Sequence, residues 1–191
     1  WSKITSPTTD HLLAIWGVAS NKVWAVGDSG RIIFWDGLSW QIVPSGSTAS
    51  LRSIWGSAQD SIWAVGAGGT ILHWDAIKWS SVNSGVISLL NGVWGNSSNN
   101  AWAVGDAGVI LRWDGVAWSS VTSPTMLNLS KIWGTGPDTA WAVGRIPVKW
   151  DGKNWTSLYD FSSHELRGIW GTSATDTWIV GYNNIILHRQ P

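Results

Sequence analysis

The 191-residue chain contains no cysteine and only one glutamate, Glu165, and only 13% of its residues are charged. Without cysteine it can form neither a disulfide framework nor a thiolate nucleophile. The formal net charge is zero and no basic stripe is present, which argues against nucleic acid or an anionic membrane as the main partner. No apolar run reaches the roughly 18 residues of a membrane-spanning helix, so we expect no membrane insertion.

The sequence also lacks the common signatures of catalysis and metal binding. A glycosidase needs at least two converging carboxylates, whereas most aspartates here recur in equivalent turns. The four histidines have no metal-ligand spacing. Neither a GxSxG elbow nor a phosphate-binding loop occurs. We therefore expect a protein that is not an enzyme and that needs no metal and no cofactor.

Tryptophan, by contrast, is in large excess. The chain contains 19 tryptophans but only two phenylalanines and two tyrosines. In the second of several similar stretches the tryptophans stand at positions 55, 63, 74 and 79, and the same offsets recur from Trp16 and from Trp94. A fourth copy, from Trp133, is two residues shorter, and a fifth begins at Trp170. The first tryptophans are therefore 39, 39, 39 and 37 residues apart, a period typical of solenoids and propellers.

Each copy predicts four short β-strands. In the second copy, segments rich in Ile, Val and Trp alternate with Gly, Asp and Ser turns and span Leu51–Trp55, Ser61–Val65, Thr70–Trp74 and Lys78–Val82. No copy shows the helical spacing of apolar residues. Four strands in about 40 residues correspond to one propeller blade. We predict an all-β, five-bladed β-propeller with four antiparallel strands per blade, and a β-solenoid is the alternative.

The two ends of the chain predict how the ring closes. The fifth copy stops before its fourth strand, whereas Trp1–Pro7 (WSKITSP) nearly matches Trp118–Pro124 (WSSVTSP). We therefore expect residues 1–5 to pair as the outer strand of the last blade, which would remove the exposed sheet edges. If the blades were cut from a longer array, residues 1–5 could instead pair with another copy of the chain.

These boundaries define one expected domain over residues 1–191. Its blades are expected at 11–45, 51–84, 90–123, 129–159, and 166–191 together with 1–5. The chain has no initiator methionine and no signal segment, so we expect a mature form or an excised domain.

Glycine and aspartate mark the turns within each copy. Glycines lie between the second and third strands, as in Asp106-Ala107-Gly108, where a tight connection needs a positive φ. Four aspartates follow the third tryptophan, and we expect each to accept backbone N–H bonds in an Asx-turn; they are Asp36, Asp75, Asp114 and Asp151.

The tryptophans divide into an inner and an outer set. We expect those of the first and second strands to pack between neighbouring blades: Trp16, Trp55, Trp94, Trp133, Trp170, Trp24, Trp63, Trp102, Trp141 and Trp178. Those of the third and fourth strands lie where blades splay apart, so they either complete the core or stack on the apolar face of a sugar. These candidate ligand residues are Trp35, Trp40, Trp74, Trp79, Trp113, Trp118, Trp150, Trp155 and Trp1.

Residues that break the repeat are the other candidates for ligand contacts. Polar side chains at predicted strand starts and links differ from blade to blade, and we select Arg52, Arg167, Asp28, Asp106, Tyr182, His164 and Glu165. The position before the third tryptophan also varies, and we expect it to be partly exposed and to adapt blades to different ligands; it holds Phe34, His73, Arg112, Lys149 and His188.

The repeat LxxIWGxxxxDxWAVGxxGxILxWDGxxW resembles the tryptophan-rich propeller repeats of predicted secreted and surface proteins of bacteria, over essentially the whole chain. Its Asp-Gly-x-x-Trp turn is similar to Asp-box and kelch blades, although the full Asp-box pattern is absent. The five-bladed plan resembles tachylectin-2-type sugar-binding propellers in architecture, so no binding residue carries over.

Together these features predict a non-catalytic binding module. The resemblance implies a carbohydrate ligand bound at repeated inter-blade sites and an extracellular, periplasmic or cell-surface location. The alternative is a protein–protein interaction scaffold with one asymmetric surface. The expected partner is a glycan or a protein, with no nucleic acid, and the expected state is a monomer.

Overall fold

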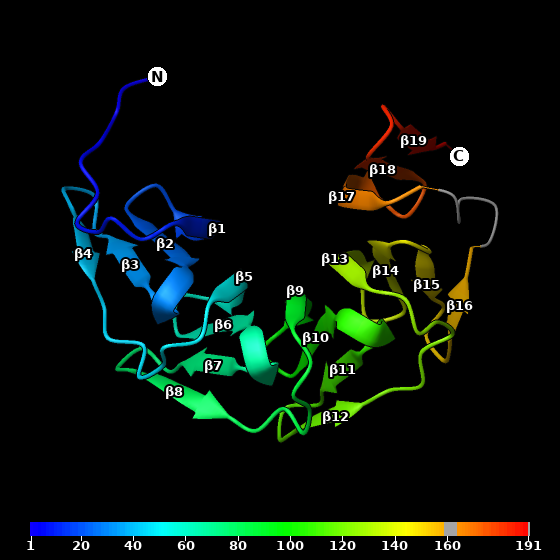
Figure 1. Cartoon of the computed structure of the whole chain (residues 1–191), viewed down its shortest axis with the longest axis horizontal. Helices are drawn as coiled ribbons and strands as arrows, with labels where there is room; N and C mark the ends of the chain where they lie inside the picture. The colour runs from blue at the N-terminus through cyan, green and yellow to red at the C-terminus, as the bar shows by residue number, and fades with distance from the viewer. Residues whose placement is uncertain (159–163, 191) are drawn as a thin grey trace.

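A computed structural model describes residues 1–158 and 164–190 and shows five antiparallel sheets placed in chain order around a common centre (Figure 1). The first sheet contains β1 (Leu12–Ala19), β2 (Lys22–Gly27), β3 (Ile32–Trp35) and β4 (Trp40–Ile42). The second contains β5 (Leu51–Ala58), β6 (Ser61–Gly66), β7 (Ile71–Trp74) and β8 (Trp79–Val82). The third contains β9 (Leu90–Ser97), β10 (Asn100–Gly105), β11 (Ile110–Trp113) and β12 (Trp118–Ser120). The fourth contains β13 (Leu129–Gly136), β14 (Thr139–Gly144), β15 (Val148–Trp150) and β16 (Trp155–Ser157), and the fifth contains β17 (Leu166–Ser173), β18 (Asp176–Gly181) and β19 (Ile186–Arg189).

This architecture confirms the five-bladed, all-β prediction. Within each sheet, every strand pairs with the next along the chain, so that β1, β5, β9, β13 and β17 lie innermost and the fourth strands lie outermost. One short 3-10 turn joins the second and third strands of the first three blades: η1 (Asp28–Gly30), η2 (Ala67–Gly69) and η3 (Asp106–Gly108). Its last glycine has a positive φ, 72° at Gly108, and an added Cβ there would lie 1.9 Å from the carbonyl oxygen of Thr125. Glycine is therefore required at this position, as predicted.

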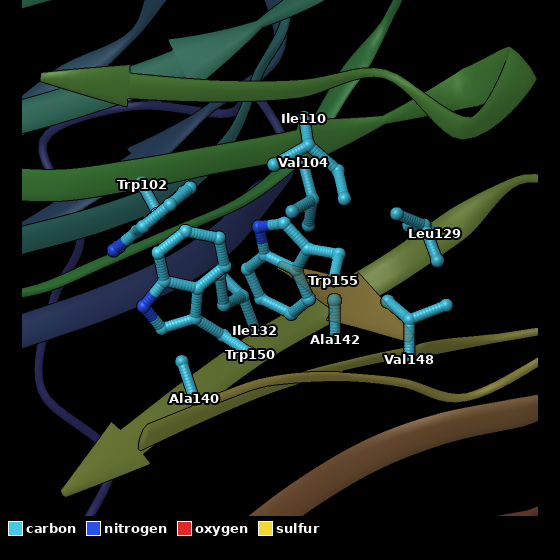
Figure 2. Close-up of a cluster of buried hydrophobic side chains, with 10 residues drawn as sticks. All are labelled: Trp102, Val104, Ile110, Leu129, Ile132, Ala140, Ala142, Val148, Trp150 and Trp155. Atoms are coloured by element: carbon cyan, nitrogen blue, oxygen red, sulfur yellow. The ribbon is translucent and has the colours of Figure 1, made fainter. Parts of the chain in front are cut away.

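The core lies between blades and repeats one arrangement. The second strand of a blade supplies a Trp and a Val, and its third strand supplies an Ile. In the third blade these are Trp102, Val104 and Ile110, and they pack on an apolar face of the fourth blade (Figure 2). Trp102 meets Trp155 edge-on, with ring centroids 5.3 Å apart at an interplanar angle of 84°. Such contacts add to the free energy gained by burying large apolar surfaces.

The first-strand tryptophans make a second repeated contact between blades. The ring of each reaches over a glycine on the innermost strand of the following blade, as Trp94 does over Gly134 and Trp133 over Gly171. These rings are half-buried, so the expected inter-blade packing is confirmed for the first four blades. In the fifth blade it fails: Trp170 and Trp178 are exposed, because no further blade covers them.

The expected closure of the ring does not form. Residues 1–11 contain no strand, the fifth sheet has three strands, and the first and last blades face each other across an opening (Figure 1). The N-terminal segment instead lies on its own blade, where Ile4 lines a cavity with Ile15 and Trp40. An ion pair of 2.6 Å between Asp10 and Arg31 holds the segment there. The expected fourth blade ended at residue 159, which lies outside the described residues.

Candidate functional site

One side chain from each of the five innermost strands lines the same groove. The strands begin with a leucine, which is buried in blades two to five, and the next residue projects into a groove of about 470 Å³ at the centre of the ring. These five residues are Leu13, Arg52, Asn91, Ser130 and Arg167. They occupy equivalent positions in the repeat, but only the two arginines have the same side-chain chemistry. The groove therefore carries the asymmetry that the regular blades lack.

A β-bulge explains why these particular residues reach the groove. The pairing between first and second strands skips one residue after the leucine in every blade, so that Leu51 pairs with Gly66 and Ser53 with Val65, which leaves Arg52 unpaired. The same shift occurs in the other four blades. Bulges redirect a side chain out of the regular alternation of a strand. The fold thus presents five freely variable side chains around one opening.

The remaining lining residues make the groove polar and charged. Leu89, Asp106, Asn128, Lys131 and Glu165 complete it. The Asn91 side-chain amide donates to Asp106 Oδ1 at 2.9 Å and to the Leu129 carbonyl at 3.0 Å. Arg167 pairs with Glu165 at 2.6 Å. These contacts hold both carboxylates of the groove, Asp106 and Glu165, in place.

Two cations in the groove have no such partner. Within residues 1–158 and 164–190, neither the Arg52 nor the Lys131 side chain forms a hydrogen bond or an ion pair. Lys131 is half-buried, and the loss of solvent lowers the pKa of its ammonium below the ordinary lysine value. Arg52 is exposed. Both groups are therefore available to a negatively charged ligand.

The groove unites four of the seven irregular residues selected from the sequence: Arg52, Arg167, Asp106 and Glu165. Tyr182 lies beside them, with its ring 4.9 Å from the Arg167 guanidinium. Asp28 lies in η1 and His164 precedes Glu165, and neither lines the groove. The groove also contains residues that were not selected from the sequence, among them Asn91, Asn128, Ser130 and Lys131. An alignment of the five repeats would have revealed Asn91 and Ser130, because each stands at the variable position after the leucine.

The outer tryptophans do not line the groove. Trp79, Trp118 and Trp155 are buried, and their indole nitrogens have no hydrogen-bond partner in the described part of the chain. Trp150 is also buried and donates to the Pro137 carbonyl at 3.1 Å. The other four of the candidate set are half-buried: Trp35, Trp40, Trp74 and Trp113. Their neighbours are chiefly other aromatic rings, as in the pair Trp74 and Trp79 at 5.8 Å, whereas Trp1 is fully exposed.

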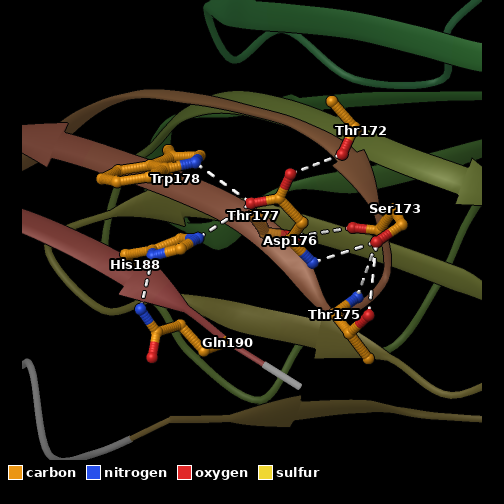
Figure 3. A network of polar contacts seen from close by, with 8 residues as sticks. All are labelled: Thr172, Ser173, Thr175, Asp176, Thr177, Trp178, His188 and Gln190. Carbon is orange, nitrogen blue, oxygen red and sulfur yellow. Dashed lines mark hydrogen bonds and ion pairs between the residues drawn. The ribbon is translucent and has the colours of Figure 1, made fainter.

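The variable position before the third tryptophan has a structural role. In every blade this side chain lies over the second-strand tryptophan of the same blade: Phe34 on Trp24, His73 on Trp63, Arg112 on Trp102, Lys149 on Trp141 and His188 on Trp178. In the last blade, His188 and Trp178 stack at 3.7 Å and both bond to Asp176 (Figure 3). Rings and cations are interchangeable there because each can cover an indole face.

The four aspartates after the third tryptophan cap turns, as predicted. Asp75 Oδ1 accepts the backbone N–H groups of Ile77 at 2.9 Å and Lys78 at 2.8 Å. The same two bonds recur at Asp36, Asp114 and Asp151. In each case these N–H bonds hold the pKa of the carboxyl below the ordinary value of 3.8. These aspartates therefore stabilise the blade edges and lie apart from the groove.

Across the described residues, no group of three or more His, Cys, Asp or Glu side chains is placed to hold a metal ion. In the same residues we find no helix with the length and apolar character that crossing a membrane requires.

Comparison with known proteins identifies the fold. The chain matches no family model and no curated protein. Among solved structures it resembles YCF48 bound to D1 peptide, with a TM-score of 0.76 and 17% identity over 100% of this chain and 68% of that one. YCF48 from Cyanidioschyzon merolae gives a TM-score of 0.75 and 16% identity over 100% and 73% of the two chains. U3-55K gives a TM-score of 0.80 and 9% identity over 97% of this chain and 63% of that one. These proteins are β-propellers, and at such low identities the likeness shows the fold alone.

Proposed function

We propose that this propeller is a non-catalytic scaffold that binds a protein partner through an extended peptide segment laid across the central groove. The observation that carries the proposal is the set of five bulge residues, one per blade, that line a single groove with four different residue types. An asymmetric lining of this kind suits one asymmetric ligand. Five equivalent sugar sites would instead need the same residues in every blade.

The charges in the groove indicate what the segment carries. Arg52 and Lys131 are unpaired, whereas the two carboxylates already contact Asn91 and Arg167. A ligand carboxylate can pair with Arg52 in a bidentate way and gain a charge-assisted hydrogen bond. We therefore propose a peptide with acidic side chains. The likeness to YCF48, whose structure was solved with D1 peptide bound, is consistent with a peptide ligand.

Carbohydrate remains the second candidate and has weaker support. The proposed sugar platforms, the outer tryptophans, mostly direct their rings at other aromatic side chains. On the resemblance of the tryptophan-rich repeat alone, we also propose kinship with bacterial secreted propellers and an extracellular, periplasmic or cell-surface location.

The proposal is tested by selecting peptides from a random library on the immobilised protein and measuring the best binder by fluorescence anisotropy. We expect an acidic consensus. We expect Arg52→Ala to weaken binding roughly tenfold or more, because a charge-assisted bond contributes about 1.5–3 kcal/mol. Arg145→Ala, a change at an exposed arginine outside the groove, is the matched control and should leave the affinity unchanged.

Two results would contradict the proposal. Equal effects of Arg52→Ala and Arg145→Ala would show that binding depends on overall charge and not on the groove. Binding to a glycan array, with no peptide selected and with sensitivity to changes of Trp35 or Trp113, would favour the carbohydrate reading instead.

A further inference from the structure

The two blades that face the opening each expose half of an interface that the chain builds repeatedly between its inner blades. At three of the four inner junctions, a projecting Trp–Val–Ile set on one blade packs on an apolar face of the next. The fifth blade retains the projecting set, and the first blade retains the receiving face. Neither half meets its complement within the chain (Figure 1).

The projecting half on the fifth blade consists of Trp178, Val180 and Ile186. Their exposed fractions are 41%, 47% and 66%, whereas the equivalent Trp63, Val65 and Ile71 of the second blade are at most 1% exposed. In the corresponding set of the third blade, every member is at most 2% exposed. Exposed apolar groups that are buried at all equivalent positions indicate a surface made for contact.

The receiving half lies on the first blade around a cavity of about 340 Å³. Leu12, Ile15, Ala25, Ile33 and Trp40 line it. At the first inner junction the equivalent face of the second blade is formed by Leu51, Ile54, Ala64, Leu72 and Trp79, and it holds Trp24, Val26 and Ile32. Ile15 is 66% exposed, whereas Ile54 is 6% exposed. The cavity thus stands where an inner blade receives a tryptophan.

A second contact between blades also has both halves free. At each inner junction a first-strand tryptophan reaches over a glycine of the next blade, as Trp55 does over Gly95. Trp170 is 60% exposed, and the atoms nearest to a Cβ added at Gly17, the equivalent glycine of the first blade, belong to Lys22 and Val23 and not to a tryptophan ring. Two features of the inner junctions, the Trp–Val–Ile packing and the tryptophan–glycine contact, are therefore both left incomplete at the first and fifth blades.

We propose that a second copy of this chain supplies that partner, with the fifth blade of one molecule docked on the first blade of the next. The two exposed faces are complementary halves of one junction, so the contact must be head-to-tail. A junction between two like faces, fifth blade on fifth blade or first on first, would match nothing. The N-terminal segment lies at the rim of the receiving cavity through Ile4 and Ser6, so docking displaces it. This assembly replaces the monomer expected from the sequence.

Sedimentation velocity over a wide range of concentration tests the proposal. We expect the wild-type mass to rise with concentration. Ile15→Asp blocks the receiving face and Val180→Asp blocks the projecting face, and both residues are exposed, so each variant should fold and remain a monomer of 20.8 kDa. Mixed in equal amounts, the two variants should form a species of twice that mass, because each retains the half that the other lacks. Val116→Asp, at an exposed turn, should associate like the wild type.

The mixing result decides between the possible occupants. A wild-type chain that stays monomeric at every concentration would overturn the proposal. It would do so even if the chain were found to bind a different propeller. Self-association of either blocked variant alone would overturn the head-to-tail geometry. If Val180→Asp does not fold, Trp178→Ala takes its place, and the same complementation with Ile15→Asp is expected.

Discussion

Trp94 lies so close to the backbone of Gly134 that an added Cβ on the glycine would come within 2.6 Å of the indole ring. The same Cβ would lie 2.6 Å from the carbonyl oxygen of Thr139. The glycine therefore contacts a half-buried ring and the backbone of its own hairpin. The blade spacing depends on the absence of a side chain at this position.

Gly134→Ala should consequently destabilise the fold. Neither the ring nor the backbone can move freely, and overpacking of this kind costs about 1–3 kcal/mol. Gly136→Ala is the matched control, since a Cβ there has no neighbour within 4 Å, and it should be neutral or stabilising by up to about 1 kcal/mol. Urea unfolding followed by tryptophan fluorescence measures both variants. Equal unfolding free energies for the two would contradict the close packing of Trp94.

The four turn aspartates should make stability depend on acid pH. Their pKa values are lower in the folded chain than the ordinary 3.8, so the unfolded chain binds protons first as the pH falls. Their contribution should be complete above the ordinary pKa and disappear as the pH falls through the lowered values. Replacing all four by asparagine keeps the accepting oxygen but removes the titration. Unfolding midpoints measured between about pH 5 and about pH 2 should then fall less steeply than in the wild type. An unchanged pH profile would show that other carboxyls, such as Asp10 or Asp176, dominate.

Lys131 should lower the stability of the fold while it strengthens the binding of an acidic peptide. Its pKa is lowered because burial disfavours the charged form, and no partner in the described residues compensates for this cost. Lys131→Met should raise the unfolding free energy near neutral pH by about 0.5 kcal/mol, because solvent still reaches part of the side chain. The gain should shrink as the pH rises through the lowered pKa, where the wild-type lysine becomes neutral.

The same substitution should weaken the acidic peptide selected on the groove. Lys78→Met, at an exposed turn, serves as the control and should change neither property. A loss of stability in Lys131→Met would contradict the prediction, because it would mean that burial does not destabilise the Lys131 ammonium group.

The sequence predicted those parts of the molecule that depend on local chemistry. The period, the strands and the turn glycines follow from residues a few positions apart, and so does the capping by Asp75. Arg52 and Arg167 stood out because they interrupt a repeat. The β-bulges that turn them into one groove did not, since a bulge is set by the register between two strands and leaves no mark at Arg52 itself.

Other features depend on how blades are placed relative to one another. The near identity of Trp1–Pro7 with Trp118–Pro124 suggested a closed ring, but closure requires a particular rotation from blade to blade. That rotation is set by contacts such as Trp94 on Gly134, and the resulting ring stays open. Likewise, Trp79 looks like a surface aromatic in its own blade, and it is buried because side chains of the preceding blade, Trp24 among them, pack against it.

The Trp–Val–Ile junction also determines how the molecule comes apart. The junctions couple each blade only to the blades next to it. Unfolding should therefore resemble that of a one-dimensional chain of linked units more than the loss of one central core. The fifth blade has a single junction and lacks a fourth strand, which makes it the weakest unit. Amide hydrogen exchange should therefore begin in β18 and β19 and advance inward blade by blade. The exposed fifth blade therefore determines where unfolding begins and in which order the blades are lost.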